Sequence, residues 1–362
     1  MTDPLASPAH AGWLRRNLFA TPVSAFATVL LGAFVVRAAA RTFRWAIGGA
    51  VFRADEVACR ALDHRAACWG FVAEKHRLIL FGRYPYAEQW RPLVATALVV
   101  AMLAATAFPR LWRRWVVSAW ALVLAAFLLL MGGGALGLSR VDPGEWGGLP
   151  LTVLLTIVAM TASIPLGVLL ALGRRSPLPL ARTLTSTYVE LVRGVPLITV
   201  LFVASFVFPL VLPQGLKLGA LARVCVAMTL FQAAYLAEVV RGGLQALPRG
   251  QHEAAASLGL GYWQTQRRII LPQALVLVIP SFVNSLLSMF MDTSLVTVVS
   301  MYDLTGSLRL ALGDPRWRSF FLEGYLFVAA IYFAACLALS RYSQWLELRL
   351  GGWARRPREA RA

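Results

Sequence analysis

The sequence predicts an all-α, polytopic membrane protein with about eight transmembrane helices. Of its 362 residues, 59% are hydrophobic and only 14% are charged, whereas soluble domains are roughly 45–50% apolar. Several apolar runs approach the ~20 residues that a helix needs to cross a bilayer. Short arginine-rich linkers separate some of these runs, and such linkers are typical of the cytoplasmic side of a membrane. Composition, run length and charge pattern therefore indicate the same fold class.

The expected crossings follow the apolar runs in chain order. The first run comes after the arginines of the N-terminal segment and is long, with no obvious small-residue cleavage site behind it. A retained first helix is therefore favoured over a cleaved signal peptide. The predicted crossings are approximately 19–36, 92–108, 115–131, 149–172, 185–212, 218–240, 273–291 and 321–340.

Arginine placement orients these crossings. The linkers PRLWRRW and GRRSPLPLAR and the basic tail 347–362 concentrate arginine, which assigns them to the cytoplasm and predicts that both chain termini are cytoplasmic. The exception is the stretch 37–91, which is rich in arginine although the order of the crossings places it on the extracytoplasmic side. Because long loops weigh little under the charge rule, we keep this assignment and expect short helices at the membrane interface.

The cysteines offer one candidate pair. Cys225 and Cys336 lie inside apolar runs and are interpreted as packing residues. Cys59 and Cys68 share the 37–91 stretch and are a candidate disulfide if it faces an oxidising compartment. His64 lies between them, but the spacing lacks the CxxC or HxxxH form of a metal site, so no metal is predicted.

The chain shows no catalytic or nucleic-acid-binding pattern. Its net charge of +18 comes almost entirely from arginines spread over short loops and a tail, without the aromatic-interleaved stripe of a nucleic-acid platform. The only lysines, Lys75 and Lys217, precede His76 and Leu218, so neither belongs to a phosphate loop. We therefore predict a non-enzymatic chain that binds no cofactor, contacts membrane lipid and takes any nucleotide energy from a partner.

The segment 242–272 is a polar, helix-prone connection between the sixth and seventh runs. A first short helix is expected over 251–258, with Glu253 in its first turn followed by three alanines. Gly259 and Gly261 are expected to end it, a second helix is expected over 262–270, and Pro272 is expected to stop that one. The small alanine face suits docking in a groove of another protein, and an ordinary amphipathic surface hairpin is the alternative.

Several ionisable and polar residues fall inside the apolar runs, where they are costly and so indicate a functional path. Glu190 and Arg193 are three residues apart and are expected to neutralise one another. Glu238 and Arg241 repeat that spacing, and an intrahelical pair near the interface is the favoured interpretation.

The seventh crossing holds the more suggestive polar residues. Pro280 is expected to break this helix, so that freed carbonyls, Asn284 and Asp292 face a cavity. An interhelical hydrogen bond from Asn284 is the alternative. The candidate substrate path comprises Glu190, Arg193, Glu238, Asn284, Asp292 and Thr293.

Four strings of the sequence resemble one family, the membrane permease subunits of bacterial ATP-binding-cassette importers for polar amino acids. YVELVRGVPLITVLF, AAYLAEVVRGGLQALPRGQHEAA and DTSLVTVV are similar to the amino-acid-specific branch. Met291 departs from the pattern, because many relatives carry lysine there. The first 150 residues look like the general L-amino-acid permease subgroup, whose importers pair two unlike permeases. The signature cytoplasmic loop of the family is matched by Gly250, Glu253, Ala254, Ala255, Gly259, Ile269, Leu271 and Pro272. The resemblance implies that this loop couples the permease to its ATPase, with 253–259 as the helix that sits in a groove of the ATPase.

The resemblance implies a type I importer permease with a five-helix core in the bacterial inner membrane. It implies an extension at 1–148 with about three crossings and a long extracytoplasmic loop, a core at 149–346 and a cytoplasmic tail at 347–362. The expected partners are two ATPase subunits that use ATP and Mg, a second permease and an external amino-acid-binding protein. A secondary transporter driven by an ion gradient is the alternative, but no convincing internal repeat supports it.

Overall fold

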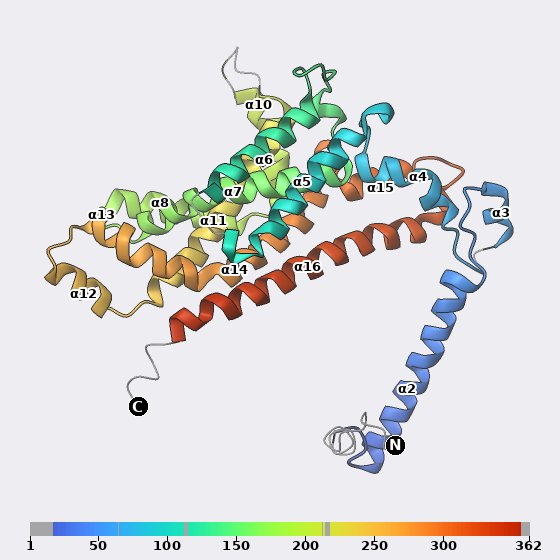
Figure 1. Ribbon diagram of the computed structural model, residues 1–362, viewed down its shortest axis with the longest axis horizontal. Helices are drawn as coiled ribbons and strands as arrows, with labels where there is room; N and C mark the ends of the chain where they lie inside the picture. Colours follow the sequence, from blue (N-terminus) through green and yellow to red (C-terminus); the bar gives the residue numbers. More distant parts are fainter. Residues whose placement is uncertain (1–16, 64, 112–114, 212, 214–217, 356–362) are drawn as a thin grey trace. The chain divides into compact units, whose positions relative to one another are not determined.

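The computed structural model describes residues 17–355 except 64, 112–114, 212 and 214–217 (Figure 1). His10, His64, Lys217 and part of the basic tail lie outside these residues. The described chain is helical, with two isolated β-bridges and no strand. It forms two compact units, Met1–Glu74 and Lys75–Ala362, which are considered separately.

The first unit is built on one long apolar helix. Helix α2 (Pro22–Phe43) begins at Thr21, whose hydroxyl accepts the Ser24 N–H, and continues as a π-helical turn, η1 (Arg44–Gly48). The predicted first crossing, which stops at 36, is therefore too short. Hydrophobicity falls at Arg37, but arginine and alanine are good helix formers, so the backbone continues past the apolar run.

Two short helices follow, α3 (Glu56–Ala61) and α4 (Gly70–Phe81). Asp55 caps the first, and a Cys59–Cys68 disulfide closes the loop between them.

The second unit contains most of the candidate membrane spans. In the described part of the chain, seven helices are long and apolar enough to cross a membrane, or eight if one bent pair counts as a single span. The polytopic all-α fold is thus confirmed. In this unit the long helices are α5 (Trp90–Thr106), α6 (Trp115–Gly132), α7 (Gly148–Arg174), α11 (Ala220–Gln245), α14 (Leu271–Asp292) and α16 (Phe321–Arg355).

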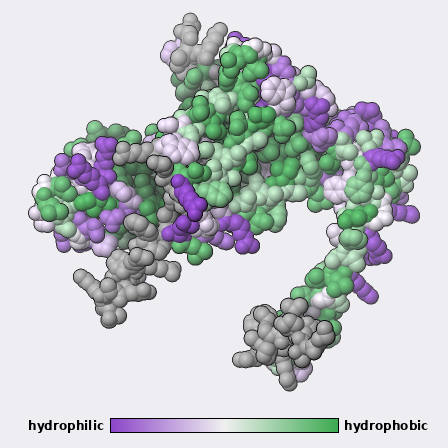
Figure 2. All heavy atoms as spheres, in the orientation of Figure 1, coloured by the Kyte–Doolittle hydropathy of each residue, from purple (hydrophilic) through white to green (hydrophobic). Residues whose placement is uncertain are grey.

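Helices α7 and α11 form the centre of this bundle (Figure 1). Leu151 and Leu155 of α7 pack with Met228 of α11 and Met289 of α14 in a buried cluster. Figure 2 shows hydrophobic side chains over the middle of the bundle and hydrophilic ones mainly toward its ends, including the end that carries α12 and α13. This distribution suits a bundle surrounded by lipid.

The predicted fifth crossing is not one straight helix. It consists of α8 (Pro179–Gly194), then α9 (Leu197–Phe202), a π-helical turn and α10 (Phe208–Val211), with a bend of 104° after α8. Val195 adopts extended backbone before Pro196. Proline disfavours a helical conformation in the residue before it and has no N–H to continue the ladder.

Two predicted helix breaks in and before α14 are wrong. Pro280 lies inside α14, which continues through it. Pro272 does not stop the second short helix but stands in the first turn of α14, directly after the π-helical turn η6 (Gln266–Ile270). A proline is tolerated in a first turn because its missing N–H has no intrahelical partner there.

Two aspartates fix the connections before α16. Buried Asp303 accepts the Gly306 N–H at 2.8 Å and so caps α15 (Leu304–Ala311), and burial raises its pKa. Asp314 accepts a hydrogen bond from Lys75 Nζ at 2.9 Å and also bonds Arg316. Hydrogen bonds from Arg316 and Lys75 hold the pKa of Asp314 well below its usual range. The connection therefore keeps a charged anchor at neutral pH.

Candidate functional site

A cavity of about 640 Å³ lies where the broken helix meets α11 and α14. The bend itself contributes the backbone around Pro196, so the interruption of the helix forms part of the wall. Arg193 and Asp292 bring opposite charges to the same cavity. The polar or aromatic side chains that line it are Arg193, Phe231, Gln232, Tyr235, Asn284, Ser285, Ser288 and Asp292.

Most of these polar groups lack a partner within the described chain. The side chains of Asn284, Ser288 and Asp292 form no hydrogen bond or ion pair with any described residue. The guanidinium of Arg193 lies 5.5 Å from the centre of the Tyr235 ring. Unpaired polar groups inside a membrane bundle are costly unless a cavity holds water or a ligand. This cavity therefore suits a polar molecule that carries both signs of charge.

The predicted substrate-path residues divide into two groups. Arg193, Asn284 and Asp292 line the cavity, whereas Glu190, Glu238 and Thr293 do not. Thr293 is buried and donates to the Phe290 carbonyl at 2.8 Å. Met291, which departs from the family pattern, is half exposed and also lies outside the lining.

Sequence reasoning missed several lining residues. For Ser288 on α14 a signal was available, because it lies four residues from each of the predicted residues Asn284 and Asp292 and so shares their helix face. Gln232 was another, as a lone amide within an apolar run. The aromatic wall formed by Phe231 and Tyr235 carries no such signal, since aromatic residues in a membrane helix usually face lipid or core.

An ion cluster beside the cavity joins α7, α8 and α11. Glu238 of α11 forms ion pairs with Arg174 of α7 and Arg241 of α11, the latter at 2.7 Å. Arg193 Nη1 lies 3.6 Å from Glu238 Oε1, and Arg174 Nη2 lies 3.4 Å from Glu190 Oε1. Three guanidinium groups thus share two carboxylates.

The predicted Glu190–Arg193 pair is wrong within the described structure. Arg193 turns toward Glu238 on the neighbouring helix, and Glu190 is reached by Arg174 instead. The side chain of Glu238 is 18% exposed and that of Glu190 is 70% exposed. A more buried carboxylate interacts more strongly with a cation because water screens it less. The predicted Glu238–Arg241 contact is present.

The segment 242–272 forms two short helices separated by a glycine turn. Helix α12 (Gly250–Ser257) ends at Gly259, which has φ +71°. Gly259 N–H donates to the Ala256 carbonyl and Leu260 N–H donates to the Ala255 carbonyl, at 2.9 and 3.1 Å. These two bonds form a Schellman motif, which requires a left-handed residue after the helix end. Helix α13 (Tyr262–Thr265) then leads through η6 into α14.

One face of this segment is open. Glu253 and Ala254 are exposed, whereas Ala255 is buried against the rest of the chain. Leu258 is 76% exposed and Trp263 is 68% exposed. Sequence reasoning did not single out these apolar side chains, although they flank the glycine turn in a polar segment. Exposed large apolar groups beside a free carboxylate are typical of a protein-docking surface. Leu271 and Pro272 lie at the start of α14, with Pro272 exposed.

Comparison with known proteins places this bundle in a class. Residues 163–352 match the family described as "Binding-protein-dependent transport system inner membrane component". The chain belongs to this family of membrane subunits of transport systems, which confirms the predicted relationship.

Individual relatives extend over nearly the whole chain. It is 42% identical to "Inner membrane amino-acid ABC transporter permease protein YhdY" of Escherichia coli, over 93% of this chain and 92% of that protein. It is 36% identical to "Glutamate/glutamine/aspartate/asparagine transport system permease protein BztC" of Rhodobacter capsulatus, over 96% and 95% respectively. A solved structure described as "Crystal structure of an amino acid ABC transporter with histidines" matches with 31% identity and a TM-score of 0.50, covering 56% of this chain and 92% of that one.

Proposed function

We propose that this chain is a permease subunit of an ATP-binding-cassette importer that carries amino acids across the bacterial inner membrane. The observation that carries the proposal is the cavity lined by both Arg193 and Asp292. An amino acid has a carboxylate and an ammonium group on one carbon, so a site with one cation, one anion and neutral hydrogen-bonding groups complements it. The amino-acid permeases among the relatives support this cargo.

The proposed assembly contains two ATPase subunits, a second permease, unlike this one, and an external amino-acid-binding protein. ATP and Mg act on the ATPases, and this chain hydrolyses nothing. Residues 149–346 form the transport core, 1–148 the extension and 347–362 a cytoplasmic tail, and both termini lie in the cytoplasm. The likeness to an amino-acid permease over 93% of this chain supports this organisation.

The ion cluster allows Arg193 to exchange one carboxylate partner for another. Arg193 lines the cavity and also reaches Glu238. A cargo carboxylate that enters would compete with Glu238 for Arg193, while Arg174 and Arg241 keep Glu238 compensated. Cargo binding is thereby tied to the packing of α8 against α11. Alternating access requires such a link between the site and the helices that move.

The segment 242–272 is the proposed coupling element. Helix α12 is connected to α11 on one side and through α13 to α14 on the other, and both of these helices line the cavity. A displacement of α12 by an ATPase would therefore be transmitted to two walls of the cavity. We assign docking to the exposed face with Glu253, Ala254, Leu258 and Trp263, and the turn to Gly259.

The test measures ATP-driven uptake of amino acids by the complete importer in proteoliposomes. Asp292→Asn and Arg193→Gln should each raise KM by about tenfold to a hundredfold, because a hydrogen bond to a charged group contributes about 1.5–3 kcal/mol. Glu145→Gln, which removes an exposed carboxylate outside the cavity, is the matched control and should leave KM unchanged.

Unchanged KM in both cavity variants would overturn the assigned site. Uptake by this chain without ATPase subunits or ATP would instead favour the secondary transporter and sink the importer proposal.

A further inference from the structure

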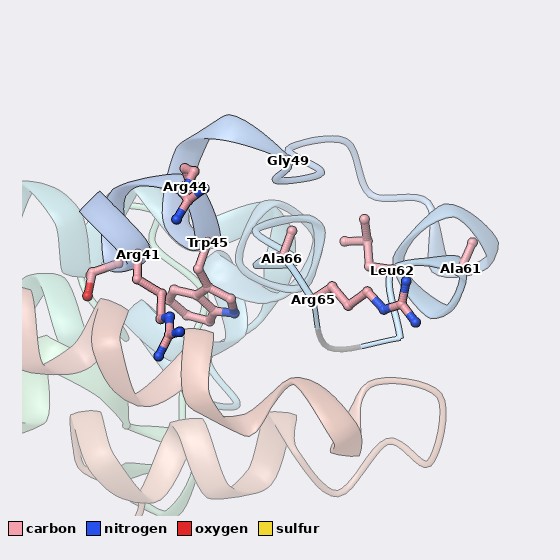
Figure 3. Close-up of a pocket in the computed structure, with 9 residues that line it drawn as sticks. Arg41, Arg44, Trp45, Gly49, Ala61, Leu62, Arg65 and Ala66 are labelled. Atoms are coloured by element: carbon pink, nitrogen blue, oxygen red, sulfur yellow. The ribbon is translucent and has the colours of Figure 1, made fainter. Parts of the chain in front are cut away.

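A second cavity, of about 800 Å³, lies in the first unit at the C-terminal end of α2 (Figure 3). One wall is the end of α2 and the turn η1, which contribute Arg41, Arg44 and Trp45. The other wall is the loop after α3, which contributes Leu62 and Arg65. Nothing in the proposed transport cycle uses this cavity.

The loop that forms the second wall is held in place. The Ala67 N–H donates to the Trp45 carbonyl at 2.8 Å, and the Trp69 indole N–H donates to the Ala46 carbonyl at 2.8 Å. The Cys59–Cys68 disulfide closes the same loop. Arg65 is therefore carried on a segment fastened to the end of α2, so the two walls form a preformed site.

The cavity is strongly basic. The guanidinium groups of Arg41, Arg44 and Arg65 form no ion pair or hydrogen bond with a described residue. No carboxylate is among the described residues that line the cavity. Arg37 and Arg41 are four residues apart on α2, with Arg44 three further, so the helix gathers cations on one face just before the cavity. Figure 3 shows the Arg65 side chain directed away from Arg41 and Arg44, so the three guanidinium groups do not converge on one point. Unpaired guanidinium groups that line one cavity still favour an anion, and a phosphate group readily accepts their N–H donors.

The depth of the cavity identifies the source of that anion. About 20 helical residues cross the ~30 Å hydrocarbon core, so a span that starts at Pro22 reaches the opposite interface near Arg41. Trp45 suits this interfacial depth. Phe43 and Ile47, on the same turns as the arginines, are 60% and 54% exposed. Apolar side chains exposed between cations suit lipid chains below and charged headgroups above, and they do not suit the surface of a water-soluble partner.

We infer that this cavity binds the phosphate headgroup of an anionic phospholipid, with Arg41 and Arg44 as the arginines beside the phosphate, Arg65 adding positive charge on the opposite wall, and Trp45 as the wall against the acyl chains. Arginines are usually concentrated in cytoplasmic loops. A lipid-binding site would explain why the stretch 37–91, assigned to the opposite side of the membrane, is nevertheless rich in arginine. It anchors the end of α2, none of whose residues is buried. The inference is independent of the cargo proposed above.

The test counts bound lipids by native mass spectrometry of the purified full-length protein in micelles of phosphatidylcholine with a minor fraction of phosphatidylglycerol. The unsubstituted protein should retain phosphatidylglycerol in preference. The variant Arg41→Gln/Arg44→Gln/Arg65→Gln should lower the ratio of phosphatidylglycerol to phosphatidylcholine by at least about tenfold, because each arginine near an anionic surface contributes roughly fivefold. The lysine counterpart, Arg41→Lys/Arg44→Lys/Arg65→Lys, should keep most of the preference.

A matched control removes the same charge elsewhere. Arg53→Gln/Arg140→Gln/Arg318→Gln replaces three exposed arginines outside the cavity and should retain the preference. Equal loss in both glutamine variants, or no preference in the unsubstituted protein, would overturn the site. Displacement of the lipid by inorganic phosphate at the same concentration would show a free-phosphate site instead. If the Arg41→Gln/Arg44→Gln/Arg65→Gln variant retained the lipid preference but no longer bound the external amino-acid-binding protein, the cavity would be a protein-docking site. That result would also overturn the inference.

Discussion

At the scale of single residues, Gly259 connects local conformation most directly to the proposed coupling. Its φ of +71° lies in the left-handed region, and an added Cβ would meet no atom within 4 Å. The constraint on this position is therefore backbone conformation and not space. A left-handed residue with a side chain costs roughly 1–2 kcal/mol, more for a β-branched one. Gly261 has φ −69° and equally open surroundings, so it carries no such constraint.

We predict that Gly259→Val abolishes ATP-coupled uptake while the protein still inserts in the membrane. The valine would unwind the Schellman motif and reorient α12, which touches the core through Ala255. Uptake and ATP hydrolysis by the reconstituted importer measure the effect. Gly261→Ala is the matched control and should transport normally, and Gly259→Asn should retain part of the activity because asparagine tolerates a left-handed conformation. Normal uptake by the valine variant would refute the assignment.

At the scale of helices, the break at Pro196 and the ion cluster at Glu238 act on the same packing contact. The break lets the end of α8 carry Arg193 to the cavity wall, and Glu238 holds that arginine together with Arg174. Helices α7 and α8 are thus both tied to α11 by charge. Removing one partner from a partly buried ion cluster leaves the others uncompensated, which costs more than the pair contributed.

We predict that Glu238→Gln lowers the free energy of unfolding by about 2–4 kcal/mol, because three arginines lose a shared carboxylate that is largely buried. Glu190→Gln, which removes the exposed carboxylate of the same cluster, should cost less than about 1 kcal/mol. Thermal unfolding of the detergent-solubilised protein compares the two. The double variant Arg174→Gln/Glu238→Gln should recover part of the loss. Equal shifts for the two single variants would contradict a central role of Glu238.

At the scale of the whole molecule, the number of crossings decides on which side of the membrane the termini and each loop lie. Eight crossings place both termini on one side, whereas seven would separate them, and the difference is whether the bent pair α8 to α10 spans the membrane. The proposed function needs α12 in the cytoplasm, where ATPases are. It also needs the loop between α6 and α7 on the opposite side.

We predict that a membrane-impermeant maleimide labels intact cells carrying Ala135→Cys but not those carrying Ser257→Cys. Both sites are exposed, the first between α6 and α7 and the second on α12. The free cysteines Cys225 and Cys336 are replaced by alanine in both variants, and the Cys59–Cys68 disulfide is kept. Labelling after cell disruption is the control for reactivity. The reverse pattern would invert the topology and remove the coupling assignment.

Much of the fold could be predicted from the sequence because lipid leaves few alternatives. A chain segment in the bilayer must satisfy its own backbone hydrogen bonds, so a long apolar run becomes a helix whatever surrounds it. The long spans α5, α6, α7 and α14 accordingly begin and end within a few residues of their apolar runs. Errors arose at prolines, because the same residue ends a helix at Pro196, begins one at Pro272 and is accommodated at Pro280.

The class of this protein, most of its membrane spans and the glycine turn of the segment 242–272 could be predicted without a structure, since these depend on run length, backbone preference and local motifs. Which polar groups contact one another became visible only in the folded chain. Glu238 binds Arg174, 64 residues away, and Trp69 bonds the backbone of Ala46, 23 residues away. Such contacts depend on how the helices pack against one another, and the positions of the helices in the sequence do not specify that packing. The cavity lined by Arg193 and Asp292 and the basic cavity at Trp45 both result from that packing.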